Sequence, residues 1–273
     1  MPASQSNDNK PPLRIAALAQ VDGSICGHLL QGLVRNDVEL SAILVDTKPE
    51  LARDTALHFQ RTGGRMQRLG YGVFEELKIP LYFVRDHNDA AALSLLAQLR
   101  IDLVVNAGTP RILNERFLRV PNVGTVNCHP GLLPHFRGCS AVEWALYLDE
   151  PIGNSVHLMT PSIDEGPMLA QQVLTASPGE MYQDIRARVY AEGAEFLGRT
   201  VRAIQLGDLS TESADRQETG RYFSPIPDEL FQRALCKVQQ GNYGPKYEVG
   251  CSPLILEPDV AKHCNSHGKS KVR

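Results

Sequence analysis

Short apolar segments alternate with helix-length segments along the first half of the chain, and this alternation restricts the fold more than any other feature. Apolar runs at 13–19, 38–46, 79–86 and 101–108 have the length of strands. Segments with helical spacing separate them, such as the leucine-rich run at 88–100. Strands that alternate with helices form βαβ units, and near-continuous apolar strands indicate a sheet covered on both faces. We therefore predict an α/β protein with a doubly wound, mostly parallel sheet.

The second half of the chain continues this pattern. Three more strand candidates lie at 123–127, 155–160 and 167–175. Two segments of the form Ser-x-x-Glu, at 140–143 and 177–180, have the composition of capping boxes, so we predict that a helix begins at each of them. In open sheets of this kind, ligands bind beyond the carboxyl ends of the strands. The polar residues that follow 123–127 therefore lie where a site is expected.

The chain divides into three parts. Residues 1–12 are polar and bounded by prolines, and we expect them to be disordered. Residues 13–208 contain the whole strand and helix pattern and form the main domain. Residues 209–273 are a short C-terminal extension, in which we predict a linker, one helix within 224–241 and a disordered end at 263–273.

Charge and hydropathy exclude two classes of partner. The formal net charge of -3 provides no basic surplus, so we expect no nucleic-acid partner. No apolar run approaches the roughly 20 residues that cross a bilayer, and the first residues do not form a signal peptide, so we expect no membrane association. A cytoplasmic protein, alone or as a homodimer, is the resulting expectation.

The cysteines are scattered and include no Cys-x-x-Cys pair, which is typical of reduced thiols in the cytoplasm. Four potential metal ligands do cluster in one segment: Cys128, His129, His135 and Cys139. Their spacing matches no zinc pattern, and adjacent residues rarely point toward one ion. We therefore expect no metal site.

A polar stretch, "VNCHPGLLPHFRG" at 126–138, overlaps the end of the strand candidate at 123–127. Its prolines fix φ and its glycines permit unusual backbone angles, so we expect a stiff, irregular loop. Asn127 and His129 are two residues apart and point to the same side if the strand persists through them. A carboxamide beside an imidazole suits a carbonyl whose oxygen gains negative charge, because the amide stabilises the oxyanion and the imidazole moves a proton.

The loop lacks a carboxylate that would orient His129, and the turn "PSIDEG" supplies one at Asp164. Spacing alone does not tie the two together. Taken singly, Asn127 is compatible with a strand-end cap, His129 with a structural histidine and Asp164 with a turn residue. Glu165 is the alternative carboxylate in the same turn.

Three segments together resemble the formyltetrahydrofolate-dependent formyltransferases. The stretch at 126–138 is similar to the family motif N-x-H-P-x-L-L-P-x-[FY]-x-G, and "SIDEGPML" is similar to its D-x-G turn. "NAGTPRIL" at 106–113 resembles the family's A-G-x-x-R-I-L segment. The resemblance covers roughly residues 13 to 206 and implies a Rossmann-like domain that uses 10-formyltetrahydrofolate as its formyl donor. Residues 13–208 would be the catalytic domain.

The resemblance also implies roles for individual residues. Asn127, His129 and Asp164 correspond to the catalytic trio of the family. Contacts to the pterin of the donor are implied for Arg111, Ile112, Leu113, Ile163 and Asp164. An amine of the acceptor would attack the formyl carbon, and Asn127 and protonated His129 would stabilise the oxyanion of the tetrahedral intermediate. Asp164 would hold His129 and help carry the amine proton to N10.

The acceptor is less closely defined. Family members that formylate glycinamide ribonucleotide bind its phosphate through a G-S-N turn after the first strand, and here Gly23 and Ser24 match while Ile25 replaces the asparagine. We expect His135 and Arg137 to lie at the mouth of the cleft, near a phosphate or nucleotide of the acceptor. The segments "HFRG" and "EWAL" favour a small amine, above all a nucleotide-linked amino sugar. Glycinamide ribonucleotide and hydroxyornithine remain alternatives.

Three further functions are weighed against this one. Methionyl-tRNA formylation is disfavoured because 209–273 shows neither a run of strands nor a basic surplus. Formyltetrahydrofolate hydrolases share the trio but carry a regulatory domain ahead of the catalytic one, whereas residues 1–12 are too few for a domain. A non-catalytic folate-binding module would have no use for all three catalytic groups.

Overall fold

The structure is a computed structural model that describes residues 11–69, 72–177, 179–212, 214, 217, 220–245 and 264–265. Its centre is a seven-stranded sheet in the order β3-β2-β1-β4-β5-β7-β8. The strands are β1 (Ile15–Gln20), β2 (Leu40–Asp46), β3 (Leu81–Val84), β4 (Leu103–Asn106), β5 (Gly124–His129), β7 (Ile152–Leu158) and β8 (Met168–Leu174). The first five are parallel, and β7 and β8 are antiparallel to their neighbours. The prediction of a doubly wound, mostly parallel sheet is confirmed.

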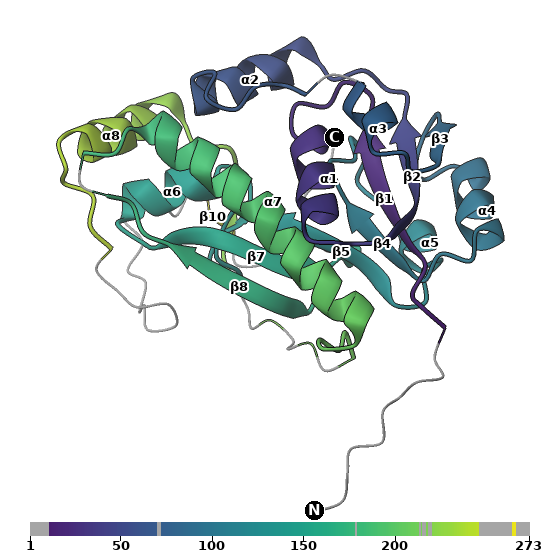
Figure 1. Ribbon diagram of the computed structural model, residues 1–273. Helices are drawn as coiled ribbons and strands as arrows, with labels where there is room; N and C mark the ends of the chain where they lie inside the picture. The colour runs from purple at the N-terminus through teal and green to yellow at the C-terminus, as the bar shows by residue number, and fades with distance from the viewer. Residues whose placement is uncertain are drawn as a thin grey trace, which may run out of the picture.

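Helices cover both faces of this sheet (Figure 1). They are α1 (Cys26–Arg35), α2 (Ala52–Thr62), α3 (Gly72–Glu76), α4 (Ala90–Gln98), α5 (Glu115–Leu118), α6 (Ala141–Leu148), α7 (Tyr182–Leu206) and α8 (Asp228–Gln239). One core cluster joins α1 and α7 to one face of the sheet, and another joins α4 and α5 to the opposite face. The alternation of side chains along β1 explains the division, because Ala17 belongs to the first cluster and Leu18 to the second.

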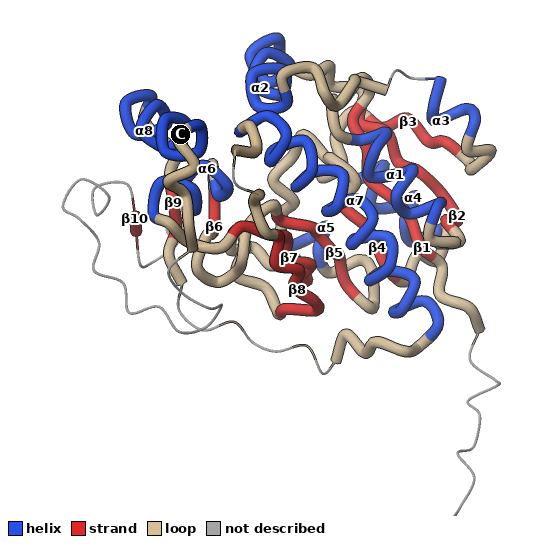
Figure 2. The backbone as a smooth tube through the Cα atoms, turned by 60° about the vertical axis from the view of Figure 1, so that its left-hand side comes forward, coloured by secondary structure: helices blue, strands red, loops and turns tan. Residues whose placement is uncertain are grey.

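A third core cluster lies beside the sheet, where α6, α7 and α8 meet (Figure 2). Trp144 of α6 packs against Phe223, and Phe223 stacks on Phe136. Phe223 belongs to a small second sheet of β6 (Arg137–Gly138), β9 (Tyr222–Phe223) and β10 (Cys264–Asn265). The C-terminal extension therefore folds back on the main domain, and its predicted helix is α8.

The first predicted capping box is wrong, and the second is formed only in part, because Glu180 accepts a hydrogen bond from the Ser177 amide at 2.9 Å but the helix begins further on. Ser140 precedes α6 with a φ of 54°, and its hydroxyl makes no cap hydrogen bond. Glu143 turns inward to Arg61 and Arg186 instead. The second helix, α7, begins at Tyr182, later than expected. In both cases an arginine outside the motif pairs with the glutamate, since Glu180 also pairs with Arg188.

The predicted disorder of the chain ends lies outside the described residues, except for residues 11 and 12 and the two residues of β10. Pro178, expected in the first turn of a helix, is also outside them. Within the described part of the chain, no helix combines the length and apolar character needed to cross a bilayer.

Candidate active site

Strand β5 carries Asn127 and His129 at the carboxyl edge of the sheet. The strand persists through His129, two residues beyond the expected end, because it pairs with β7 over that length: Asn127 lies opposite His157, and His129 lies opposite Ser155. Residues two apart on a strand share one face. Asn127 and His129 are therefore presented on the same side, as the sequence predicted.

Asp164 lies against His129 although 35 positions separate them in the sequence. Its Oδ2 is 3.4 Å from His129 Nδ1 and accepts a hydrogen bond from the Gly138 amide at 2.9 Å. The φ of Asp164 is 55°, a conformation that few non-glycine residues adopt. Gly166 closes this turn, and a Cβ there would lie 1.7 Å from the Leu158 carbonyl oxygen. The D-x-G motif thus requires its glycine for close packing, and the turn aims the carboxylate at His129.

The alternative carboxylate, Glu165, points elsewhere. Its Oε1 is 3.2 Å from Nη1 of Arg137. Arg137 is only 5% exposed, so it lies within the fold and not at the mouth of a cleft as expected. His135, placed at the same mouth by the sequence, is half-buried. The structure therefore separates the two neighbouring acids, with Asp164 at the histidine and Glu165 on the buried arginine.

A second histidine, His157, reaches the same carboxylate from β7. Its Nε2 is 3.6 Å from Asp164 Oδ1 and accepts a hydrogen bond from Asn127 Nδ2 at 3.1 Å. Its Nδ1 lies 3.0 Å from the Leu158 carbonyl oxygen, so Nδ1 carries the proton. Burial lowers the pKa of His157 below its ordinary value, despite the neighbouring Asp164. The ring is therefore neutral and serves as a fixed acceptor for the Asn127 amide.

Asn106, the last residue of β4, completes a chain of hydrogen bonds through Asn127. Its Nδ2 donates to Asn127 Oδ1 at 2.8 Å, and its Oδ1 accepts from the amides of Gly108 and Thr109. The carboxamide of Asn127 is thus held from both ends, by Asn106 and by His157. The sequence contains a signal for Asn106, because two apolar strand segments that are parallel neighbours in the sheet, β4 and β5, each have an asparagine at or near the carboxyl end. Neither Asn106 nor His157 was predicted as a site residue.

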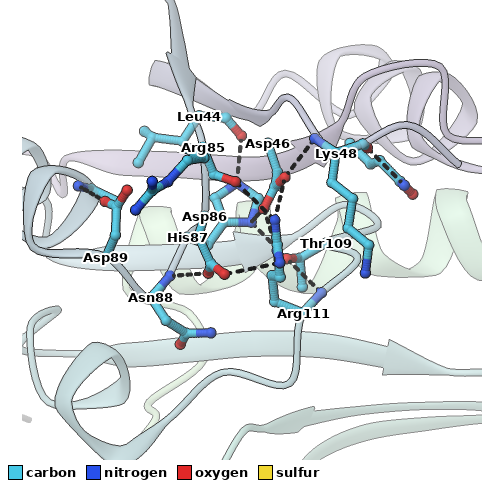
Figure 3. Close-up of polar contacts among 12 residues, drawn as sticks. Leu44, Asp46, Lys48, Arg85, Asp86, His87, Asn88, Asp89, Thr109 and Arg111 are labelled. Atoms are coloured by element: carbon cyan, nitrogen blue, oxygen red, sulfur yellow. Dashed lines mark hydrogen bonds and ion pairs between the residues drawn. The ribbon is translucent and has the colours of Figure 1, made fainter.

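The segment expected to contact the formyl donor is anchored by its arginine (Figure 3). Arg111 pairs with both carboxylate oxygens of Asp46, at 2.7 and 3.0 Å, and with Asp86 at 2.9 Å. Beside it, buried His87 contacts the Thr109 hydroxyl, and burial lowers the pKa of its imidazole. The guanidinium therefore binds within the chain. What Arg111 contributes is a fixed backbone for the residues that follow it.

Those residues differ in exposure. Ile112 exposes 60% of its side chain, whereas Leu113 is buried with α4 and α5. Asn88 accepts from the amide of Asn114 and donates to the carbonyl of Ile112, which fixes the segment from the other side. Ile163, in the Asp164 turn, is half-buried. Of the residues expected at the donor, Ile112 is thus the side chain that this segment presents to solvent.

The expected phosphate turn after β1 already holds a carboxylate of the protein. The Ser24 amide and hydroxyl both donate to Glu50, at 2.9 and 2.6 Å, and Gly23 lies directly before them. Glu50 also accepts from the Thr55 hydroxyl. Ser24, Thr55 and Arg68 hold the pKa of the Glu50 carboxyl below its ordinary value, although burial alone would raise it. The two donors of Ser24 therefore bind an anion that belongs to the chain.

The C-terminal extension supports the polar loop that ends at Gly138, a role that the sequence did not predict. Strand β9 pairs with β6, and the amides of Arg137 and Cys139 donate to the carbonyls of Arg221 and Phe223. A Cβ on Gly138 would lie 2.5 Å from the Phe223 carbonyl oxygen, so this close approach requires glycine. The Gly138 amide that binds Asp164 is thus placed by the extension.

Among the described residues, no group of three or more histidines, cysteines and carboxylates is arranged to hold a metal ion. Burial raises the pKa of the Cys128 thiol to about 12, so this neighbour of Asn127 and His129 stays protonated. Acid–base chemistry at this edge rests on the imidazole and carboxylate groups.

Comparisons with known proteins agree with the geometry. A sequence model of the formyl transferase family matches residues 13–201. A methionyl-tRNA formyltransferase from Thermotoga maritima is 25% identical over 189 residues, which are 69% of this chain and 58% of that protein. The chain therefore spans less than two thirds of this relative.

Solved structures show the same fold. A glycinamide ribonucleotide transformylase from Symbiobacterium toebii superposes with a TM-score of 0.59 at 22% identity, over 79% of this chain and 99% of that one. A sugar N-formyltransferase from a Shewanella species superposes with a TM-score of 0.55 at 18% identity, over 78% and 77%. The matched family region ends before β9 and α8, so the extension lies outside it.

Proposed function

The chain belongs to the formyl transferase family, and we propose that it is an enzyme that transfers a formyl group from 10-formyltetrahydrofolate to the primary amine of a small acceptor. The observation that carries the proposal is the meeting of Asn127, His129 and Asp164 at the carboxyl edge of the sheet. His157 and Asn106 hold the Asn127 carboxamide in one orientation.

The residues present fit the formyl donor. Ile112 exposes an apolar side chain on a backbone that Arg111 and Asn88 fix, which suits a flat ring of mixed polarity. The donor supplies a formyl group bonded to a nitrogen that becomes the leaving group. In our proposal Arg111, Ile112, Leu113, Ile163 and Asp164 line its site. Arg111 acts there through its backbone, since its side chain is bound to Asp46 and Asp86.

The trio would manage the charge that develops during transfer. Asn127 Nδ2 has two hydrogens, and His157 accepts one of them, so the second would donate to the formyl oxygen as its charge grows. His129 lies between the Phe136 carbonyl oxygen, 2.6 Å from Nε2, and Asp164, and both neighbours are acceptors. Both ring nitrogens can donate to them only when the imidazole carries two protons. In this form the positive charge of His129 would stabilise the oxyanion, because both of its N–H groups are donated to acceptors of the protein.

The proton balance requires a route from the amine to the leaving nitrogen. A bond forms between the acceptor nitrogen and the formyl carbon, the bond from that carbon to N10 breaks, and the amine proton ends on N10. Asp164 lies against His129 and His157, and it would accept and return this proton through His129 or a water molecule. The acceptor must arrive as a neutral amine.

The acceptor proposed from the sequence is a nucleotide-linked amino sugar, with hydroxyornithine and glycinamide ribonucleotide as alternatives. One observation bears on the last of these. The donors of Ser24 that match the phosphate turn bind Glu50, so a phosphate there would have to displace a carboxylate. Transfer to water is the remaining alternative reaction.

Incubation with 10-formyltetrahydrofolate and a panel of amines tests the proposal. We expect tetrahydrofolate release that depends on an amine and is lost in Asn127→Ala. Release at the same rate without any amine would indicate a hydrolase. Binding of the donor without release in any mixture would indicate a non-catalytic folate-binding protein, and the proposed function would be wrong.

A further inference from the structure

A cavity of about 400 Å³ opens beside His129, on the side of the C-terminal extension. The residues that line it come from the end of β5, the segments that follow β5 and β6, the helices α2, α6, α7 and α8, and the segment that leads into α8. Its volume lies at the small end of the roughly 300–1,000 Å³ typical of small-molecule sites. A compact ligand would fill it and place one end against His129.

One wall of the cavity belongs to the extension. Ile226 and Phe231 line it, opposite Leu57 of α2. The wall is fixed in place because the Ser224 carbonyl accepts from the Trp144 indole at 2.9 Å and β9 pairs with β6. These wall residues lie beyond the matched family region, which ends at residue 201. This wall of the cavity is therefore contributed by the extension.

The polar lining of the cavity contains a buried carboxylate shared by two arginines. Glu143 is 2% exposed, and its Oε1 accepts from the Tyr182 hydroxyl at 2.5 Å. Arg61 and Arg186 lie 3.4 and 3.3 Å from the same oxygen. Burial would raise the pKa of the Glu143 carboxyl, but Arg186 and Arg61 hold it below its ordinary value. Two guanidinium groups and one carboxylate leave this cluster with one positive charge in excess.

Arg61 is the member of the cluster that can reach a ligand. Its side chain is 20% exposed, whereas that of Arg186 is 2% exposed. Its contacts to Glu143 and to the Ser140 hydroxyl are both 3.4 Å, longer than the roughly 2.7–2.9 Å of a strong charge-assisted hydrogen bond. Asp228 also lines the cavity, but it is exposed at the start of α8, where water screens it. An anion beside Arg61 would balance the excess charge.

We propose that this cavity binds the amine-bearing end of the acceptor, and that an anionic group on this end, a carboxylate or a phosphate, binds Arg61 while the amine lies beside His129. An apolar spacer between the two groups would contact Leu57, Ile226 and Phe231. The proposal rests on the proposed function for the role of the amine. In this proposal the extension limits the size of the acceptor, and Arg61 selects an acceptor that carries a negative charge.

The turn after β1 sharpens this assignment. Ser24 would be the other candidate for an anion of the acceptor, but its amide and hydroxyl already bind Glu50. The cluster around Arg61 has the reverse balance, with more cation than anion. Of these two positions, the cavity is the one where positive charge exceeds the negative charge of the protein and can bind an anion of the ligand.

The test compares binding of three probes by isothermal titration calorimetry, without any folate. The probes are 5-aminopentanoate, its phosphate counterpart 4-aminobutyl phosphate, and pentylamine, which has the same amine and spacer length but no anion. We expect wild-type protein to bind at least one of the anionic probes roughly 10-fold or more tightly than pentylamine, as a charged hydrogen bond provides. The better of the two identifies the anion.

Two variants on α2 locate the effect. Arg61→Gln should abolish the preference for the anionic probe, and Arg61→Lys should retain part of it. Arg53→Gln is the matched control, because Arg53 lies on the same helix with an 81% exposed side chain and does not line the cavity. Thermal unfolding of each variant shows whether it is folded. In turnover, Arg61→Gln should raise KM for the acceptor and leave KM for 10-formyltetrahydrofolate unchanged.

Three outcomes would overturn the proposal: equal binding of pentylamine and the anionic probes, an undiminished preference in folded Arg61→Gln, or no binding of any probe. Release of tetrahydrofolate is measured separately. If the probes do not bind as expected but amine-dependent release of tetrahydrofolate is intact, the anion site alone is rejected. If tetrahydrofolate is not released, the proposed function is rejected.

Discussion

Two histidines flank Asp164, and their different hydrogen-bond partners favour different roles in the proposed reaction. His157 has both ring nitrogens committed, one as donor to the Leu158 carbonyl and one as acceptor from Asn127. Burial lowers its pKa, so it stays neutral. His129 has acceptors at both nitrogens and also lines the cavity beside the loop. One ring therefore orients the Asn127 amide, and in the proposed reaction the other would carry a proton.

A large effect is expected when the amide that His157 orients is removed. Asn127→Ala deletes the proposed donor to the formyl oxygen, which should lower kcat by roughly 100- to 1,000-fold. The KM for 10-formyltetrahydrofolate should change little, because the interaction forms only as charge develops. Steady-state release of tetrahydrofolate measures both constants, and circular dichroism checks the fold. Activity near wild type would refute the role of Asn127.

A smaller effect is expected when the amide is kept but loses one of its two supports. Asn106→Leu preserves side-chain size and removes the donor to Asn127 Oδ1. We expect kcat to fall by roughly 10-fold through misorientation of the carboxamide. A residue of purely structural importance would lower stability and leave kcat of the folded enzyme intact, so kcat and the urea midpoint are measured together. Restored kcat in Asn106→Gln would show that the donor itself matters.

The smallest effect concerns stability and pH. Because burial lowers the pKa of His157 and His87 below the ordinary value of 6.5, the unfolded chain binds more protons than the folded one as the pH falls below that value. The free energy of unfolding should therefore decrease between about pH 6.5 and the lower pKa values of the folded state. Urea unfolding at a series of pH values measures this slope.

His157→Gln should make that slope shallower. The substitution removes one of the rings whose pKa burial lowers and retains an acceptor for Asn127. An unchanged slope would contradict the assignment of His157 as a buried neutral ring.

Sequence patterns predicted the sheet well because strand and helix periods are local properties. The two final strands were found, and their antiparallel direction follows from the short turn at 161–167, which cannot hold a parallel crossover. The capping box at 140–143 failed because Glu143 binds Arg61 and Arg186, which are distant in sequence, and a local pattern contains no information about them.

The sequence predicted the site residues that lie in contiguous motifs. It missed those that only the fold brings to the site. Asn127 and His129 share a strand, whereas Asn106 joins them through the register of parallel neighbours. Strand β9 has two residues, which is too short to show any period. Arg61 meets Glu143 only because α2 and α6 lie beside the same cavity.

A matched pair of substitutions tests the division of roles most directly. The side-chain oxygen of glutamine can replace an accepting Nε2, but glutamine cannot carry a proton. We predict that His129→Gln lowers kcat/KM for tetrahydrofolate release by roughly 1,000-fold, within the range of general acid–base groups, and that His157→Gln lowers it less than about 10-fold. Equal losses, or a larger loss at His157, would contradict the account.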